Sequence, residues 1–244
     1  MQPMELIITI FNESLTRPVF NLLVWIYNII PGQDFGIAII AVTVLLRVAL
    51  YPLSNKALKS QRALQELQPK IKEIQKKFKN REEQAKAMME FYKEHKVNPF
   101  SGCLPLLIQL PLLIALYRVF LTGLNPDSLE SLYSFVQSPG VLDPMFLGLV
   151  DLAQPSHALA ILAGVSQFLQ AKTAFAKMPS MGAAGKGADF SKSMQQSMIY
   201  MMPLFMVFIA WNLPAGLALY WVVTMLFSLG QQLVVNKTFS SNKA

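Results

Sequence analysis

The sequence predicts an all-α membrane protein with five transmembrane helices, and three observations lead to this fold class. Hydrophobic residues make up 53% of the 244-residue chain and charged residues only 14%, whereas soluble domains contain roughly 25% charged residues. The apolar residues form blocks long enough to cross a hydrocarbon core of about 30 Å. Most basic residues fall in segments that five spans would place on one side of the membrane. This composition argues against a disordered chain and against a nucleic-acid-binding domain.

The first segment, residues 1–34, is predicted to be amphipathic and to lie in the membrane interface. Its apolar stretches, residues 6–11 and 18–30, are separated by polar residues, and neither reaches the roughly 17 residues that a span needs. Trp25 and Tyr27 suit the headgroup region. We therefore expect a helix over residues 4–30 that lies in the interface. The alternative is a short, tilted sixth span.

Five apolar blocks form the predicted spans. They cover residues 35–53, 103–124, 156–176, 194–213 and 215–235. An α-helix rises 1.5 Å per residue, so blocks of about 20 residues match the thickness of the hydrocarbon core. Only Pro214 separates the last two blocks, which predicts a tight transmembrane hairpin.

The charges of the connecting segments predict the orientation of the chain. Residues 54–100 carry twelve Lys and Arg, and the segments 177–193 and 236–244 are also basic. The loop 125–155 carries no Lys or Arg but contains four acidic residues, Asp127, Glu130, Asp143 and Asp151. Because cytoplasmic loops are enriched in basic residues, we expect the N-terminus outside and the C-terminus in the cytoplasm of a multi-pass protein.

Residues 54–100 are predicted to form a cytoplasmic antiparallel helical hairpin. Apolar residues that alternate steps of three and four form a coiled-coil seam; they are Leu64, Leu67, Ile71, Ile74 and Phe78 on the first helix and Ala85, Met88 and Tyr92 on the second. Asn80, followed by Glu83, is expected to cap the second helix, and Pro69 could kink the first.

The hairpin also carries a candidate docking surface for an acidic partner. Its residues are Lys70, Lys72, Lys76, Lys77, Lys79 and Arg81. Such a surface fits an anionic lipid, ribosomal RNA or an acidic substrate tail. The alternative is an ordinary solvated face of a charged loop.

Arg47 lies well inside the first predicted span. An Arg at the centre of a span costs about 2.5–3.5 kcal/mol, and such residues usually face a water-filled cavity and mark function. Snorkelling to the cytoplasmic face is the alternative. Thr43 lies one turn away on the same face. No acidic residue lies deep in any predicted span, so an exogenous carboxylate would suit Arg47.

Further polar or amphipathic side chains in the spans complete the candidate groove: Gln109, Gln167, Tyr220 and Trp221. Motifs for catalysis are absent from the sequence. The glycine-rich segment 182–187 departs from a phosphate loop, because Ser180 stands at the position of its first glycine. His95 and His157 are not spaced as metal ligands, and Cys103 is the only cysteine. We therefore expect no enzymatic activity, no metal and no cofactor.

Four motifs resemble those of the YidC/Oxa/Alb family of membrane protein insertases. They are RVALYPLS at residues 47–54, LQPKIKEIQKK at 67–77, NPFSGCLPLLIQLP at 98–111 and NLPAGLALYW at 212–221. The resemblance extends over residues 35–235 and is specific, because it combines several unrelated motifs. It implies a five-helix core, a cytoplasmic hairpin after the first core span, and a hydrophilic groove that is open to the cytoplasm and to lipid but closed outside.

The resemblance also implies function and site. Arg47, Gln109, Tyr220 and Trp221 match the family's groove residues, and Gln167 matches less closely. The implied activity moves short hydrophilic segments of a substrate through the groove and releases its transmembrane helix into lipid. A small-solute channel or transporter and a folding scaffold for membrane proteins are the alternatives. The implied location is a bacterial-type plasma, or inner, membrane.

The implied partners are nascent membrane protein substrates and the lipid bilayer, with the ribosome and the Sec translocon as further candidates and no DNA. The chain departs from the Gram-negative pattern, which has an additional first span and a large periplasmic domain. It also lacks a lipoprotein cysteine and a long basic C-terminal tail. Ribosome binding through such a tail is therefore not expected.

Overall fold

The computed structural model of the chain describes residues 3–78, 80–95, 97–98, 104–122, 126–175 and 196–241. The fold is mostly helical, as the sequence predicts. The elements are α1 (Pro3–Phe11), η1 (Asn12–Thr16), α2 (Arg17–Ile29), α3 (Phe35–Ala49), α4 (Tyr51–Lys77), α5 (Arg81–Glu94), α6 (Leu104–Thr122), η3 (Pro126–Ser131), β1 (Met145–Phe146), β2 (Val150–Asp151), α7 (His157–Phe175), η4 (Ser197–Met201), α9 (Met202–Ala210) and α10 (Ala215–Ser241). Lys79 and the predicted loop 177–193 lie outside the described residues.

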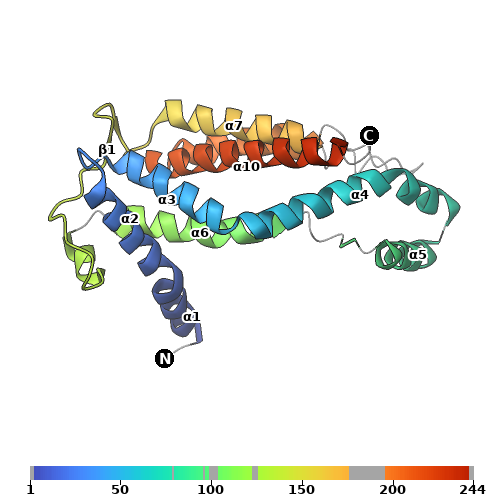
Figure 1. Cartoon of the computed structure of the whole chain (residues 1–244), viewed down its shortest axis with the longest axis horizontal. Coiled ribbons are helices and arrows are strands. Elements are labelled where there is room, and N and C mark those ends of the chain that lie inside the picture. Colours follow the sequence, from blue (N-terminus) through green and yellow to red (C-terminus); the bar gives the residue numbers. More distant parts are fainter. Residues whose placement is uncertain are drawn as a thin grey trace.

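The long helices form an elongated bundle (Figure 1). Helix α10 packs on α7 and α3, and α9 packs on α7. The hairpin of α4 and α5 lies at the same end of the bundle as the C-terminus, whereas residues 126–156, with the short antiparallel pair β1–β2, lie at the opposite end (Figure 1). We call these the hairpin end and the loop end.

The first predicted span is broken in the structure. Helix α3 ends at Ala49, and α4 begins at Tyr51 and leaves at an angle of 64°. Pro52, in the first turn of α4, has no backbone N–H to donate and its ring clashes with the preceding turn. The Ser54 hydroxyl donates to the Leu50 carbonyl at 3.0 Å. Residues 51–53, expected in the first span, therefore belong to the helix that leads into the hairpin.

Within the described part of the chain, one single helix is long and apolar enough to cross a membrane, over Ala215–Lys237 of α10. The bent pair of α3 and the first part of α4 meets the same test jointly. Shorter apolar helices cover Gln109–Leu121 and Ser197–Ala210. The number of five spans therefore stays a prediction.

The N-terminal segment forms a helix that a π-helical turn, η1, divides into α1 and α2. Helix α2 belongs to the protein core, because Phe20, Leu23 and Tyr27 are buried and α2 packs on α3 and α6. Helix α1 instead exposes apolar side chains, among them Ile7 and Ile10. Whether α1 lies in the interface or crosses the membrane stays a prediction.

In the hairpin, α4 runs through Pro69 without a break, and the Asn80 side chain caps α5 by accepting from the Glu82 N–H at 3.0 Å. The two helices contact each other where Gln84 Nε2 donates to the Gln75 carbonyl. Ala85, which the sequence places in the seam, is exposed. The seam expectation is wrong at this position, because Gln84 and the seam residue Met88 contact Gln75 of α4 while Ala85 stays exposed.

Ile71→Asp is expected to open the hairpin. Ile71 is only 1% exposed and lies one helical turn from Gln75, on the face of α4 that meets α5. A buried carboxylate there should cost on the order of 3 kcal/mol. Limited proteolysis should then cleave the hairpin faster while the other helices stay protected. Met89→Asp, at an exposed position of α5, is the matched control, and equal cleavage of the two variants would contradict the packing.

Candidate functional site

The candidate site is a chain of polar side chains that crosses three helices of the bundle. Arg47 of α3 donates from Nη2 to Oε1 of Gln109 on α6, and Gln109 Nε2 donates to the Tyr220 hydroxyl on α10. Gln109 and Tyr220 are buried, and Arg47 is half-buried. The sequence singled out all three residues. The structure brings them together, although Gln109 is 62 positions and Tyr220 is 173 positions after Arg47 in the sequence.

Within this series of hydrogen bonds, the positively charged Arg47 has only neutral partners. Across the described residues, the one ion pair joins Arg17 and Glu13, so the described part of the chain offers Arg47 no carboxylate. A half-buried guanidinium has five donors in a rigid fork that matches a carboxylate. Chemically, the site can therefore hold an acidic group from another molecule.

The structure does not gather all six predicted groove residues into one cluster. Trp221 Nε1 donates to Gln167 Oε1 on α7 at 2.6 Å, so this pair lies on a different face of α10 from the contact of Tyr220 with Gln109. Successive residues of a helix point about 100° apart, which explains why neighbours in the sequence serve two contacts. Thr43 is buried and donates to the Ile39 carbonyl of its own helix, so its hydroxyl is bonded within α3 and not to Gln109 or Tyr220.

A second polar cluster at the hairpin end was not predicted from the sequence. It joins α4, α7 and α10 to one another. Ser54 and Gln231 share hydrogen bonds, Arg62 donates to Asn236, and Gln65 donates to the Ala174 carbonyl, while Thr173 of α7 donates to Gln232 of α10. The signal available in the sequence was the run of amides near the end of the last apolar block, Gln231, Gln232 and Asn236. The first half of α4 is thus part of the bundle, and only its second half forms the hairpin with α5.

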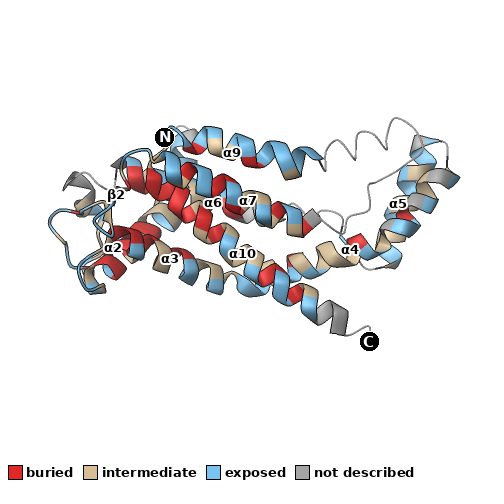
Figure 2. Ribbon diagram, turned by 90° about the horizontal axis from the view of Figure 1, so that it is seen from above, coloured by how far each residue is buried: buried red, intermediate tan, exposed pale blue. Residues whose placement is uncertain are grey.

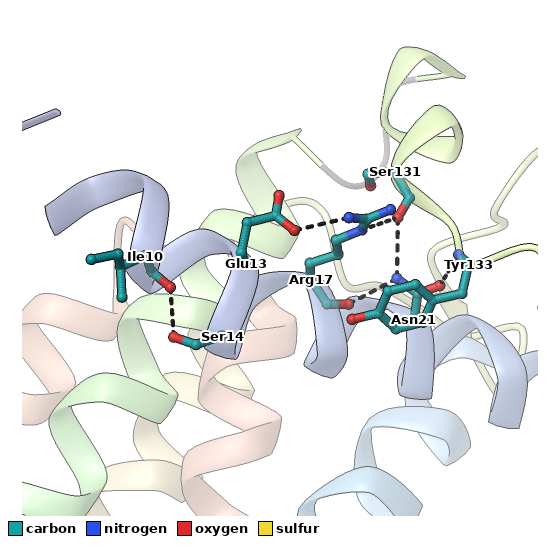
Figure 3. A network of polar contacts seen from close by, with 7 residues as sticks. All are labelled: Ile10, Glu13, Ser14, Arg17, Asn21, Ser131 and Tyr133. Atoms are coloured by element: carbon teal, nitrogen blue, oxygen red, sulfur yellow. Dashed lines mark hydrogen bonds and ion pairs between the residues drawn. The ribbon is translucent and has the colours of Figure 1, made fainter. Parts of the chain in front are cut away.

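The loop end has a polar network of its own, shown in Figure 3. Arg17 Nε and Asn21 Nδ2 both donate to the Ser131 carbonyl, and the Asn21 side-chain oxygen accepts from the Tyr133 N–H at 2.6 Å. The Glu13 carboxylate, 2.8 Å from Arg17, raises the pKa of that guanidinium. These contacts fasten α2 to the loop 126–156.

The two ends of the bundle differ in character. The main apolar core joins α2, the first half of α3, the second half of α6, the first half of α10 and the loop 126–156, and buried residues concentrate toward the loop end (Figure 2). The polar contacts of Arg47, Ser54 and Arg62 lie in the half nearer the hairpin. The main apolar core of the bundle therefore lies toward the loop end, whereas the polar contacts of these three residues lie toward the hairpin end.

The predicted docking surface is described only in part. Lys70 and Lys77 are exposed, and the Lys77 ammonium lies 5.8 Å from the centre of the Phe78 ring. Lys79 and the side chains of Lys72, Lys76 and Arg81 lie outside the described residues. As to metals, the described residues contain no group of three or more His, Cys, Asp or Glu that could hold an ion.

Comparison with known proteins identifies relatives of this chain. Residues 25–243 match the family model described as "60Kd inner membrane protein". The chain is 35% identical over 234 residues to a "Membrane protein insertase YidC" of Wolinella succinogenes. This match covers 96% of the present chain and 39% of that relative. A protein of the same name from Oceanobacillus iheyensis is 33% identical over 242 residues, with 86% of its length covered.

A solved structure gives the same picture. It is titled "Active YidC insertase crystal structure with the first transmembrane domain resolved" and matches 90% of this chain at 26% identity, with a TM-score of 0.57. The match covers 45% of that chain. This chain thus spans about two fifths of the length of the Wolinella relative and almost all of the Oceanobacillus one.

Proposed function

The chain belongs to the 60Kd inner membrane protein family, that of the YidC-type insertases, and from this premise we propose that it inserts membrane proteins into the lipid bilayer. The observation that carries the proposal is the Arg47–Gln109–Tyr220 series of contacts, in which a half-buried cation has neutral partners between the helices of the bundle. The related proteins named above are insertases by title. The activity, substrates and partners of this chain are inferred from them.

In this mechanism, Arg47 receives the acidic, unfolded segment of a substrate that must leave the cytoplasm. The guanidinium offsets part of the cost of removing a carboxylate from water, and the polar side chains of Gln109 and Tyr220 beside it reduce the change in polarity. The apolar helix of the substrate then moves along α6 and α9 into lipid. Burial of its side chains, worth about 25 cal/mol per Å², drives release without a nucleotide or a chemical step.

The asymmetry of the bundle supports an orientation for this mechanism. The hairpin end, with its exposed Lys59, Lys70 and Lys237, faces the cytoplasm, and the loop end, closed by packing, faces outside. The groove then opens toward the cytoplasm, where nascent substrates arrive. The basic hairpin offers a docking surface for an acidic partner, and the ribosome and the Sec translocon are the candidates. The membrane in this proposal is a bacterial-type inner membrane.

Cysteine labelling tests this orientation. In a Cys103→Ser background, Glu130→Cys should react with a membrane-impermeant maleimide added outside, and Lys86→Cys should react only after the cells are opened. Both side chains are exposed, so accessibility reports the side of the membrane and not burial. Labelling of position 86 from outside would overturn the orientation.

Reconstitution tests the function itself. Liposomes that contain only this chain should insert a single-span substrate with a short acidic outer segment, and protease should then degrade all but the inserted part. The same liposomes should not release a trapped small solute, because release would favour a channel. Absence of insertion above protein-free liposomes, in a preparation that retains its helical content, would contradict the proposed function.

A further inference from the structure

The turn between β1 and β2 carries two leucine side chains that no part of the described chain covers. Leu147 is 59% exposed and Leu149 81%, and only Gly148 lies between them. Single exposed apolar residues are common on protein surfaces. Two leucines presented by one three-residue turn are a different feature, and we call residues 147–149 the apolar turn.

The apolar turn lies at the level where α10 begins, and α10 is the described helix best suited to cross the membrane. The N–H groups of Ala215 and Gly216, the first two residues of α10, donate to the carbonyls of Gln154 and Leu152 at 2.9 and 3.0 Å. At α3, Phe146 lies directly against Gly36, where an added Cβ would come within 2.1 Å of the Phe146 ring. The strand pair therefore lies beside the starts of α3 and α10, where a bilayer surrounding α10 has its surface.

Two of the three backbone N–H groups of the apolar turn, those of the leucines, have partners within the chain. The Leu147 N–H donates to Asp34 Oδ2 at 2.5 Å, and the Leu149 N–H donates to the Phe146 carbonyl at 2.9 Å. Asp34 also caps α3 through Oδ1, and its contact with Leu147 holds that residue at a φ of 51°, which is unfavourable for a side chain of this size. Unpaired backbone groups are costly in lipid, and the N–H groups of both leucines are paired while their side chains are exposed.

The charges near the turn indicate which kind of membrane surface it suits. The carboxylates of Asp143 and Asp151 accept from the Met145 and Ala153 N–H groups, and residues 125–155 contain no Lys or Arg. The loop that carries the turn therefore supplies no Lys or Arg to attract anionic headgroups. The contact is therefore apolar, and insensitive to salt.

We propose that the apolar turn inserts Leu147 and Leu149 into the interfacial region of the lipid bilayer at the loop end, on zwitterionic lipid. The contact anchors the loop that covers this end of the bundle. This inference depends on α10 crossing the membrane and not on the insertase activity, so the two can fail separately.

The test places a polarity-sensitive fluorophore on the turn of the full chain in liposomes of phosphatidylcholine. In a Cys103→Ser background, Leu149→Cys carries the probe, and Glu130→Cys, an exposed residue of the same loop, is the matched control. We expect the emission at position 149 to shift to shorter wavelength and to be lost when spin-labelled lipids are present in both leaflets. The emission at position 130 should stay water-like, and Leu147→Ser should weaken the quenching at position 149.

Three outcomes would overturn the proposal. Emission at position 149 that matches position 130 and resists the spin-labelled lipids would place the turn in water. A shift to shorter wavelength without quenching by lipid would mean that protein, and not the bilayer, covers the turn. Quenching that requires anionic lipid or disappears in high salt would contradict the apolar character of the contact.

Discussion

Arg47→Ala is expected to lower the insertion of a substrate with an acidic outer segment by about 100-fold. Two charges 4 Å apart at an effective dielectric constant of 20 interact by about 4 kcal/mol, and a loss of roughly 3 kcal/mol of this corresponds to two orders of magnitude. Arg47→Lys should retain much of the activity, because it keeps the charge and loses only the fork geometry. Initial insertion rates into liposomes measure the effect.

A substrate whose outer segment has been neutralised provides the control. If Arg47 acts as an electrostatic receptor, the wild-type chain and Arg47→Ala should insert this substrate at similar rates. Arg47 also donates to Gln109, and loss of this bond leaves a buried amide oxygen without its donor, at a cost of about 1–3 kcal/mol. Equal losses on charged and neutral substrates, together with a lower unfolding temperature, would show that Arg47 serves the packing of the bundle instead.

Gly216→Ala is expected to destabilise the protein by about 1–3 kcal/mol, the usual range for overpacking a core. A Cβ at Gly216 would lie 1.9 Å from Cζ of Phe120. That ring is buried and packs edge-on against Phe35 at 5.8 Å, so it has little room to move. Thermal unfolding in detergent micelles, monitored by resistance to protease, measures this loss of stability.

The same substitution at the other end of α10 should act in the opposite direction. A Cβ at Gly230 meets no heavy atom within 4 Å, and alanine is favoured over glycine inside a helix by about 1 kcal/mol. Gly230→Ala should therefore raise the unfolding temperature slightly. If both variants were destabilised alike, the close approach of α10 to α6 at Gly216 would be wrong.

The sequence alone was sufficient for features that depend on local pattern. The blocks of apolar residues indicated helices over residues 35–53 and 215–235. Helix α3 lies within the first block, and α10 includes the whole of the second. Asn80 was identified as a helix cap, and its side chain caps α5. Arg47 was singled out because a cation within an apolar block is costly wherever its partners lie. Each of these inferences uses neighbours within about one or two helical turns.

Contacts between distant segments required the tertiary structure. Helical periodicity places residues on a common face but does not say which neighbour that face meets, so Tyr220 and Trp221 were expected together and instead contact Gln109 and Gln167 on different helices. For the same reason the hairpin seam was one position out at Ala85. The attachment of α2 to the loop 126–156 depends on bonds to residues more than 100 positions away, such as that from Asn21 to Ser131. Such contacts depend on how whole helices pack, because the free energy that selects them is shared among many side chains and no single stretch of sequence contains it.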